Sequence, residues 1–353
     1  MGARLGYLVS VLGGADNRPR RGSRLARAAV WMTALVTALA AAAVTAAPAA
    51  AGESGSRSTA AQGSISLRVP GLFNVHGDLV TVPLRSTTLH GRVTPYVPGQ
   101  VVRVRLAIDG KVWRQQYAKV LRSANGHFGW FVVQYGVPRV GHVSIAAVHL
   151  ATAKQRGFSA SRTYASLSAD VGPGSNGRFV QLVQQRLAQL HFYMPQSGVY
   201  DLQTELAVDA YHRLLGRGTS TSLDPTIVTD LLNGVGRFRV RFPNQGRHAE
   251  GDLSDQILAL VDGSKVQLLF PISSGKPSTP TVLGSWRIYL RDPGYLPDGM
   301  YYSSFFIGGY AIHGYDPSPN WPASHGCMRL PISDAIAAYD WLGLGDWVDT
   351  YYT

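Results

Sequence analysis

The chain has 353 residues, of which 45% are hydrophobic and 15% are charged, and its formal net charge is +12. This length predicts two or three domains, the apolar content excludes a wholly disordered protein, and the modest positive charge gives little support for nucleic acid as a partner. A single cysteine excludes an intramolecular disulfide and a zinc site built from several cysteines.

Residues 1–51 have the layout of an export signal. A basic run ends at Arg27, a charge-free and alanine-rich stretch follows at 28–46, and small residues surround Pro48. Basic, apolar and small-residue regions in this order are typical of a secretory signal, so we expect an exported protein that acts outside the cytoplasm. The alternative is an uncleaved anchor, since about 20 apolar residues can span a bilayer; membrane contact is expected only there.

Residues 52–63 are small and polar and are predicted to be a linker, after which a β pattern begins at Ser64. Alternating apolar runs at 101–106, 129–133 and 142–148 are separated by turn signals. Short strands at this spacing over about 100 residues are typical of a β-sandwich. We therefore predict an immunoglobulin-like β-sandwich at 64–170.

Residues 171–236 change to a helical period and predict a bundle of three short helices. One apolar stripe runs from Val180 to Leu190, and the pair Asp224-Pro225 marks the start of the last helix. The segment resembles the peptidoglycan-binding three-helix module, which implies wall binding; a plain spacer is the alternative. The matching residues are Gly177, Val180, Leu187, Leu190, Gly198, Tyr200, Asp201, Thr204, Ala207, Val208 and Gly216.

Residues 237–353 return to a β pattern, so the chain as a whole is predicted to be mainly β with a small α module. Runs at 256–261 and 265–270 indicate a hairpin, and further strands are expected at 286–290 and 310–312. Ser333 is expected to cap a helix with Ile336, Tyr339 and Leu342 on its apolar face. The run 346–351 is expected to close the sheet.

The only cysteine lies in the sequence Ser-His-Gly-Cys-Met-Arg at 324–329, and His313 stands 14 positions before Cys327. The loop between them can bring a thiol and two imidazoles together. A neighbouring histidine can lower the pKa of a thiol and hold its proton, which is the arrangement of a cysteine nucleophile. A buried structural thiol is one alternative, and a metal site formed by His313, His325 and Cys327 is another.

Two further groups near the thiol suit acyl transfer. The backbone at Gly326 and Cys327 can present N–H groups to a developing oxyanion, because glycine permits a close approach. Arg329 supplies a cation that suits a substrate carboxylate.

The pair His313-Gly314 and the motif at 324–329 resemble the signature of the L,D-transpeptidases. Residues 273–276 and Thr279-Pro280 also fit this family. Val282-Leu283 is an insertion relative to the family's commoner pattern. The resemblance covers roughly 238–352. It implies a β-sandwich-like catalytic domain at 237–353 with one helix. It also implies peptidoglycan stem peptides as the substrate and carbapenem-type compounds as inhibitors. Neither a metal nor a cofactor is expected.

The resemblance also implies a role for each matching residue. Cys327 becomes the nucleophile and His313 the base. Gly326, His325, Ser324 and Gly314 are assigned to shaping the site and its oxyanion hole. Arg329, Tyr302 and Tyr310 are the candidates for substrate binding.

The implied reaction is acyl transfer in two steps by a monomeric enzyme. Cys327 attacks the carbonyl of the third residue of a stem tetrapeptide, the terminal D-alanine leaves and a thioester remains. A side-chain amine of a second stem then attacks, which makes a 3→3 cross-link. Attack by water would make the same site an L,D-carboxypeptidase, and a non-catalytic wall-binding scaffold is a third interpretation.

Overall fold

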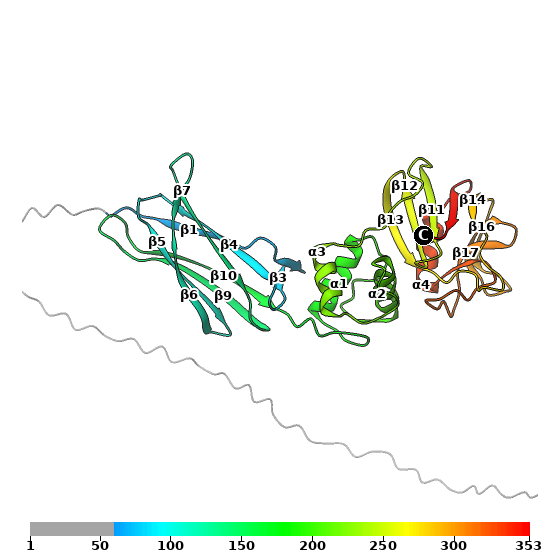
Figure 1. The fold of residues 1–353 in the computed structure, drawn as a ribbon, viewed down its shortest axis with the longest axis horizontal. Coiled ribbons are helices and arrows are strands. Elements are labelled where there is room, and N and C mark those ends of the chain that lie inside the picture. Colours follow the sequence, from blue (N-terminus) through cyan, green and yellow to red (C-terminus); the bar gives the residue numbers. More distant parts are fainter. Residues whose placement is uncertain (1–59) are drawn as a thin grey trace, which may run out of the picture. The chain divides into compact units, whose positions relative to one another are not determined.

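The structure, a computed structural model, describes residues 60–353 (Figure 1). In this range strands predominate and four helices are present, so the predicted mainly β fold class is confirmed. The predicted export signal at 1–51 and most of the predicted linker at 52–63 lie outside the described residues. Within 60–353 no helix combines the length and the apolar character needed to cross a bilayer.

The first ten strands form two sheets that share one hydrophobic core. One sheet has the order β1-β4-β8-β7 and the other β2-β3-β10-β9-β5-β6. In β8 every second residue is buried, and Phe131 from this strand joins Ile145 from the second sheet in the core. The strands are β1 (Ser64–Arg68), β2 (Phe73–Val75), β3 (Asp78–Thr81), β4 (Ser86–Thr94), β5 (Val101–Ile108), β6 (Lys111–Lys119), β7 (Leu121–Arg122), β8 (Gly129–Gly136), β9 (Gly141–His149) and β10 (Phe158–Ser166). This is the predicted β-sandwich.

Three helices follow, namely α1 (Arg178–Gln189), α2 (Leu202–Leu214) and α3 (Pro225–Asn233). The predicted stripe from Val180 to Leu190 is buried. The Asp224 side chain accepts the first free N–H groups of α3, and Gly234 ends that helix with φ 71°. The likeness to a peptidoglycan-binding module and the predicted domain boundaries remain predictions.

The remaining strands also form two sheets, β13-β12-β11-β19-β14 and β15-β16-β17-β18. Phe270 from the first sheet, Met328 from the second and Ala338 from α4 share one core. The elements are β11 (Arg247–Asp252), β12 (Ile257–Asp262), β13 (Lys265–Pro271), β14 (Gly284–Arg287), β15 (Leu290–Tyr295), β16 (Tyr301–Ile307), β17 (Tyr310–Gly314), β18 (Met328–Leu330), α4 (Ile332–Trp341) and β19 (Trp347–Tyr351). The last strand does not close the sheet as expected, because it lies inside it between β11 and β14.

The expectations for α4 were wrong in two respects. Pro331 occupies the position before the helix without a side-chain cap, and Ser333 lies in the first turn, where its hydroxyl donates to Asp334. Ile336 is 41% exposed, whereas Ala335 and Ala338 are buried. The reason is close packing: a Cβ placed on Gly314 of β17 would lie 2.6 Å from Cβ of Ala335. The small side chain of Ala335 is therefore the one that fits where α4 meets Gly314.

Candidate active site

Strand register places His313 and Cys327 on the same face of the sheet. β17 and β18 run parallel, with Ile312 opposite Met328 and His313 opposite Arg329. Side chains alternate along a strand, so Ile312 and Met328 enter the main core while their neighbours point to the other face. Cys327, directly before β18, therefore shares a face with His313 and Arg329.

The Cys327 thiol lies in a small apolar environment. It packs against a cluster that contains Met300, Phe305 and Ala311, and its Sγ–H donates to the Gly309 carbonyl at 3.6 Å. Burial raises the pKa of the Cys327 thiol, although the Ala311 amide and Arg329 act in the opposite direction. The resting thiol is therefore protonated at neutral pH.

The His313 imidazole is only 2% exposed and is held as one tautomer. Its Nδ1 donates to the Gly314 carbonyl at 2.9 Å, which leaves Nε2 with the lone pair that a general base needs. Burial lowers the pKa of His313 to about 4, against the effect of the Gly314 hydrogen bond. Thiol and imidazole are thus both neutral at pH 7. The expectation that a histidine lowers the thiol's pKa is not met, since burial dominates and raises it.

Ser324 shapes the loop that carries the thiol. Its Oγ accepts the Gly326 N–H at 3.0 Å and donates to the Cys327 carbonyl at 2.6 Å. Its own backbone N–H donates to the Ser274 carbonyl at 2.9 Å, and its carbonyl accepts the N–H of Lys276 at 3.0 Å. The segment 273–276 thus anchors the loop. Because Ser324 already uses the Gly326 amide, that amide is not free for an oxyanion as expected.

The ring of Tyr310 packs on the backbone of Gly326, and its expected contact with substrate stays a prediction. Gly326 has φ 122°, and a Cβ placed there would lie 1.7 Å from Cε1 of Tyr310. Glycine is therefore required at this position both by its backbone conformation and by the ring that covers it.

The Gly326→Ala variant is expected to lose stability by about 1–3 kcal/mol and acylation activity by about 100-fold, because strain and a steric clash displace the thiol. Thermal melting and acylation rates measure the two effects. Gly172→Ala is the matched control, since a Cβ there meets nothing within 4 Å. A Gly326→Ala enzyme with unchanged rate and stability would contradict the packing described above.

Arg329 and His313 share Tyr315 as a neighbour, a residue that the sequence analysis missed. The Arg329 guanidinium lies 4.2 Å from the centre of the Tyr315 ring, and the His313 ring meets the same ring edge-on at 6.0 Å. Nε of Arg329 is buried without a hydrogen-bond partner. Tyr315 stands two positions after His313, and strand alternation could have indicated that both lie on one side.

Two further predicted residues contact groups other than the thiol. Tyr302 packs edge-on against Tyr301 and against Tyr339 of α4. His325 is exposed, and its Nε2 accepts from Nζ of Lys276 at 3.1 Å. In the described part of the chain, no three or more His, Cys, Asp and Glu residues form a group that could hold a metal ion.

Residues 246–349 match the YkuD family, the L,D-transpeptidase catalytic domain. The chain therefore contains a catalytic domain of this family, which places it among the L,D-transpeptidase-type enzymes of peptidoglycan. No curated protein matches the chain.

Solved structures of L,D-transpeptidases are similar to parts of the chain. The enzyme from Xylanimonas cellulosilytica shares 30% identity over 51% of this chain and 97% of that chain, with a TM-score of 0.47. The catalytic domain from E. faecium shares 26% identity over 30% of this chain and 98% of that chain, with a TM-score of 0.28. The same domain acylated by ertapenem shares 25% identity over the same proportions, with a TM-score of 0.26.

Proposed function

We propose that the protein is an exported, cysteine-dependent transpeptidase that forms 3→3 cross-links in peptidoglycan. The observation that carries this proposal is the register of β17 and β18, which sets the only thiol of the chain on the same face as a buried imidazole with a free Nε2. The YkuD match supplies the class of reaction.

In the proposed mechanism both groups start neutral. Nε2 of His313 takes the proton from Sγ of Cys327 as sulfur attacks the carbonyl carbon of the third stem residue. The tetrahedral intermediate collapses, the proton moves from His313 to the departing amine of the terminal D-alanine, and a thioester remains. Because a thiolate is not populated beforehand, proton transfer must accompany the attack.

The second step reverses these roles. His313 takes a proton from the side-chain amine of an acceptor stem as its nitrogen attacks the thioester. The C–S bond breaks, the new amide is the cross-link, and the proton returns to sulfur. Arg329, whose guanidinium faces the same side as the thiol, is suited to hold a stem carboxylate.

A strained β-lactam carbonyl placed in this site is proposed to acylate Cys327 in the same way. In the ring-opened product the former lactam nitrogen stays attached to the acyl group. No fragment therefore departs to make room for the acceptor amine. We expect a stable one-to-one carbapenem adduct on Cys327, blocked by prior alkylation.

Incubation of the purified enzyme with disaccharide-tetrapeptide units tests the proposal. We expect dimers with a 3→3 bond, together with D-alanine, which is released when the thioester forms. Liquid chromatography with tandem mass spectrometry identifies both products. Tripeptides without any dimer would assign the site to an L,D-carboxypeptidase, and unchanged substrate would favour a wall-binding scaffold.

A further inference from the structure

The turn at 296–300, which joins β15 to β16, lies against the Cys327 thiol. Leu296 and Met300, at its two ends, pack in the small apolar cluster that Cys327 contacts. The Leu296 N–H donates to the Met300 carbonyl at 2.8 Å, so the turn is closed. Asp298, between these two residues, is exposed. Packing at both ends of the turn therefore sets a carboxylate at the rim of the site.

The same turn also lies against the ring of Tyr315. A Cβ placed on Gly299 would lie 3.3 Å from Cε2 of Tyr315. The Arg329 guanidinium lies 4.2 Å from the centre of this ring, and the His313 ring meets it edge-on. The turn that carries Asp298 and the side chain of Arg329 thus contact one ring. An anion and a cation therefore lie together beside the thiol and the imidazole.

The electrostatics of the two reacting groups agree with this placement. Burial has the largest influence on both: it raises the pKa of the Cys327 thiol and lowers the pKa of His313 to about 4. Against this background Arg329 lowers both pKa values and Asp298 raises both pKa values. Charges that act on both reacting groups lie close to them, because the interaction weakens with distance.

Within residues 60–353 neither of the two charges is neutralised by a neighbour. Asp298 and Arg329 take part in none of the ion pairs of this range. Oδ1 of Asp298 accepts the Met300 N–H at 3.2 Å, which holds the carboxylate in place and leaves Oδ2 for a ligand. The carboxylate and the guanidinium are therefore both available to charged groups of a substrate.

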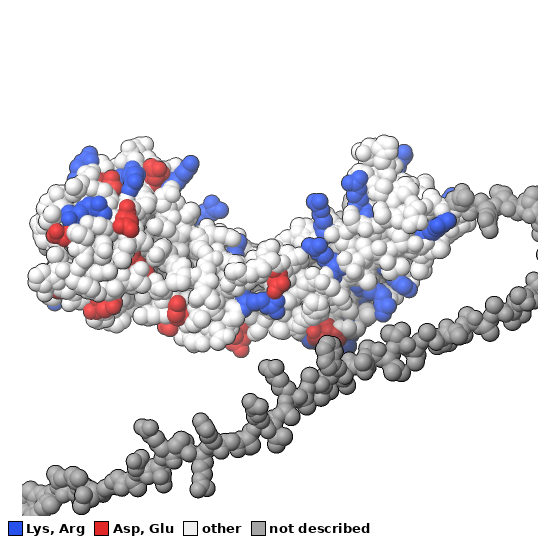
Figure 2. Space-filling view, turned by 180° about the vertical axis from the view of Figure 1, so that it is seen from behind, with Lys and Arg blue, Asp and Glu red and all other residues white. Residues whose placement is uncertain are grey.

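The domain around the site does not select a charge by itself. Residues 237–353 contain nine Lys and Arg residues against 11 Asp and Glu residues. Both signs are mixed on its visible face, at the left of Figure 2. Nearly balanced charges make a weak net field. A choice between differently charged substrates must therefore come from groups at the site.

The side chain of the third stem residue can carry one charge or two. In lysine it ends in an amine alone. In 2,6-diaminopimelate it ends in an amine and a carboxylate on the same carbon. At neutral pH the amine is an ammonium group and the carboxyl is ionised. Only the second kind of side chain presents a cation and an anion together, which matches the pair of charges beside the thiol.

We propose that Asp298 binds the ammonium group on the side chain of the donor's third residue, while Arg329 binds the carboxylate next to it. The site thus selects a diaminopimelate-type stem over a lysine stem. This assignment rests on the proposed function, because it concerns the donor that acylates Cys327. Asp298 binds substrate and takes no part in the bond changes.

Four donor tetrapeptides test the selection on the full chain. Their third residue is diaminopimelate, its side-chain carboxamide, its side-chain N-acetyl derivative or lysine. Release of D-alanine gives kcat/KM, which we expect to be about 10-fold higher for diaminopimelate than for each other donor, the effect of one charge-assisted hydrogen bond. Equal values for all four donors overturn this proposal and leave the proposed function standing. No release from any donor overturns the proposed function, and this proposal with it.

Asp298→Asn separates substrate binding from a structural role. Asparagine keeps an oxygen that can accept the Met300 N–H, so the turn is retained. We expect kcat/KM to fall about 10-fold with the diaminopimelate donor, through KM, and to stay unchanged with the N-acetyl donor, which has no ammonium group. A change in the pKa of Cys327 would affect both donors alike. Asp262→Asn, at an exposed position at the end of β12, is the matched control and should behave as wild type does. An equal loss with both donors overturns the role of Asp298.

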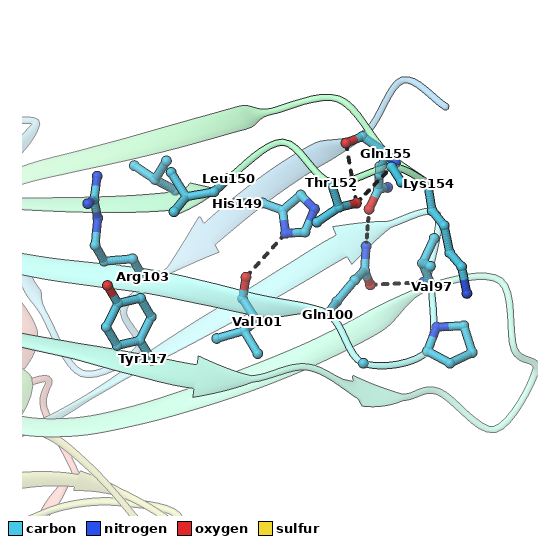
Figure 3. A pocket seen from close by; sticks show the side chains of 14 residues that line it. Val97, Gln100, Val101, Arg103, Tyr117, His149, Leu150, Thr152, Lys154 and Gln155 are labelled. Atoms are coloured by element: carbon cyan, nitrogen blue, oxygen red, sulfur yellow. Dashed lines mark hydrogen bonds between the residues drawn. The ribbon is translucent and has the colours of Figure 1, made fainter. Parts of the chain in front are cut away.

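Arg329→Gln tests the cation in the same way. The variant is expected to lose the preference for diaminopimelate over its carboxamide, a ratio that does not depend on how much of the protein is folded. Lys154→Gln is the matched control, since it removes a cation from the wall of a cavity of about 520 Å³ in the N-terminal β domain (Figure 3). It should keep the full preference. A preference that survives in Arg329→Gln, or that is lost in Lys154→Gln, overturns the assignment of the carboxylate to Arg329.

Discussion

Cys327→Ala is expected to abolish cross-linking completely, to the limit of detection. The chain has no other thiol, and alanine offers no atom that can attack a carbonyl and leave again. The fold should survive, because the side chain packs only at the edge of the small cluster around Met300, Phe305 and Ala311. Dimer yield from disaccharide-tetrapeptide measures the loss.

Cys327→Ser provides the isosteric control for this variant. A hydroxyl has nearly the size of a thiol but is a far weaker acid, so the serine enzyme should keep the wild-type melting temperature and retain little transfer activity. Dimer formation by Cys327→Ala at the wild-type rate would show that another group performs the chemistry.

His313→Ala is expected to slow acylation by about 10²–10⁴-fold, the usual effect of losing a general base. The resting thiol is already protonated through burial, so removing His313 should leave its pKa above the ordinary thiol range. The rate of iodoacetamide alkylation against pH tests this directly. In wild type and in His313→Ala the rate should rise with pH and reach its midpoint above about pH 8.5, because only the thiolate reacts.

The variant His127→Ala is the control, since it removes an exposed histidine of the N-terminal β domain. It should leave the rate of acylation and the rate of alkylation unchanged. His313→Gln keeps a side chain of similar length and separates loss of the base from loss of packing, and it should be as slow as His313→Ala. A wild-type thiol that titrates below pH 7 and shifts upward in His313→Ala would contradict the neutral pair and favour a thiolate–imidazolium pair.

Local features of the sequence predicted most of the elements. Alternation predicted β5, β8 and β9, and Asp224-Pro225 predicted the start of α3, because such signals act within a few residues of the chain. The position of β19 could not be predicted in the same way. Its neighbours β11 and β14 lie about 100 and 60 residues earlier, and no local pattern encodes so distant a pairing.

The candidate site was predicted by residue type but not by environment. The motif at 324–329 indicated Cys327, yet burial, which reverses the expected direction of its pKa shift, depends on Met300 and Phe305 from another hairpin. In the same way, no pattern in the sequence indicated that the ring of Tyr310 covers Gly326. Side-chain packing between segments far apart in the chain decides such roles.

Intact-protein mass spectrometry tests the central claim most directly. After brief incubation of the wild-type enzyme with a donor tetrapeptide unit, we expect a mass increase equal to the donor minus D-alanine, mapped to Cys327 and absent from Cys327→Ala. An enzyme that forms dimers while Cys327 never carries this acyl group would contradict it.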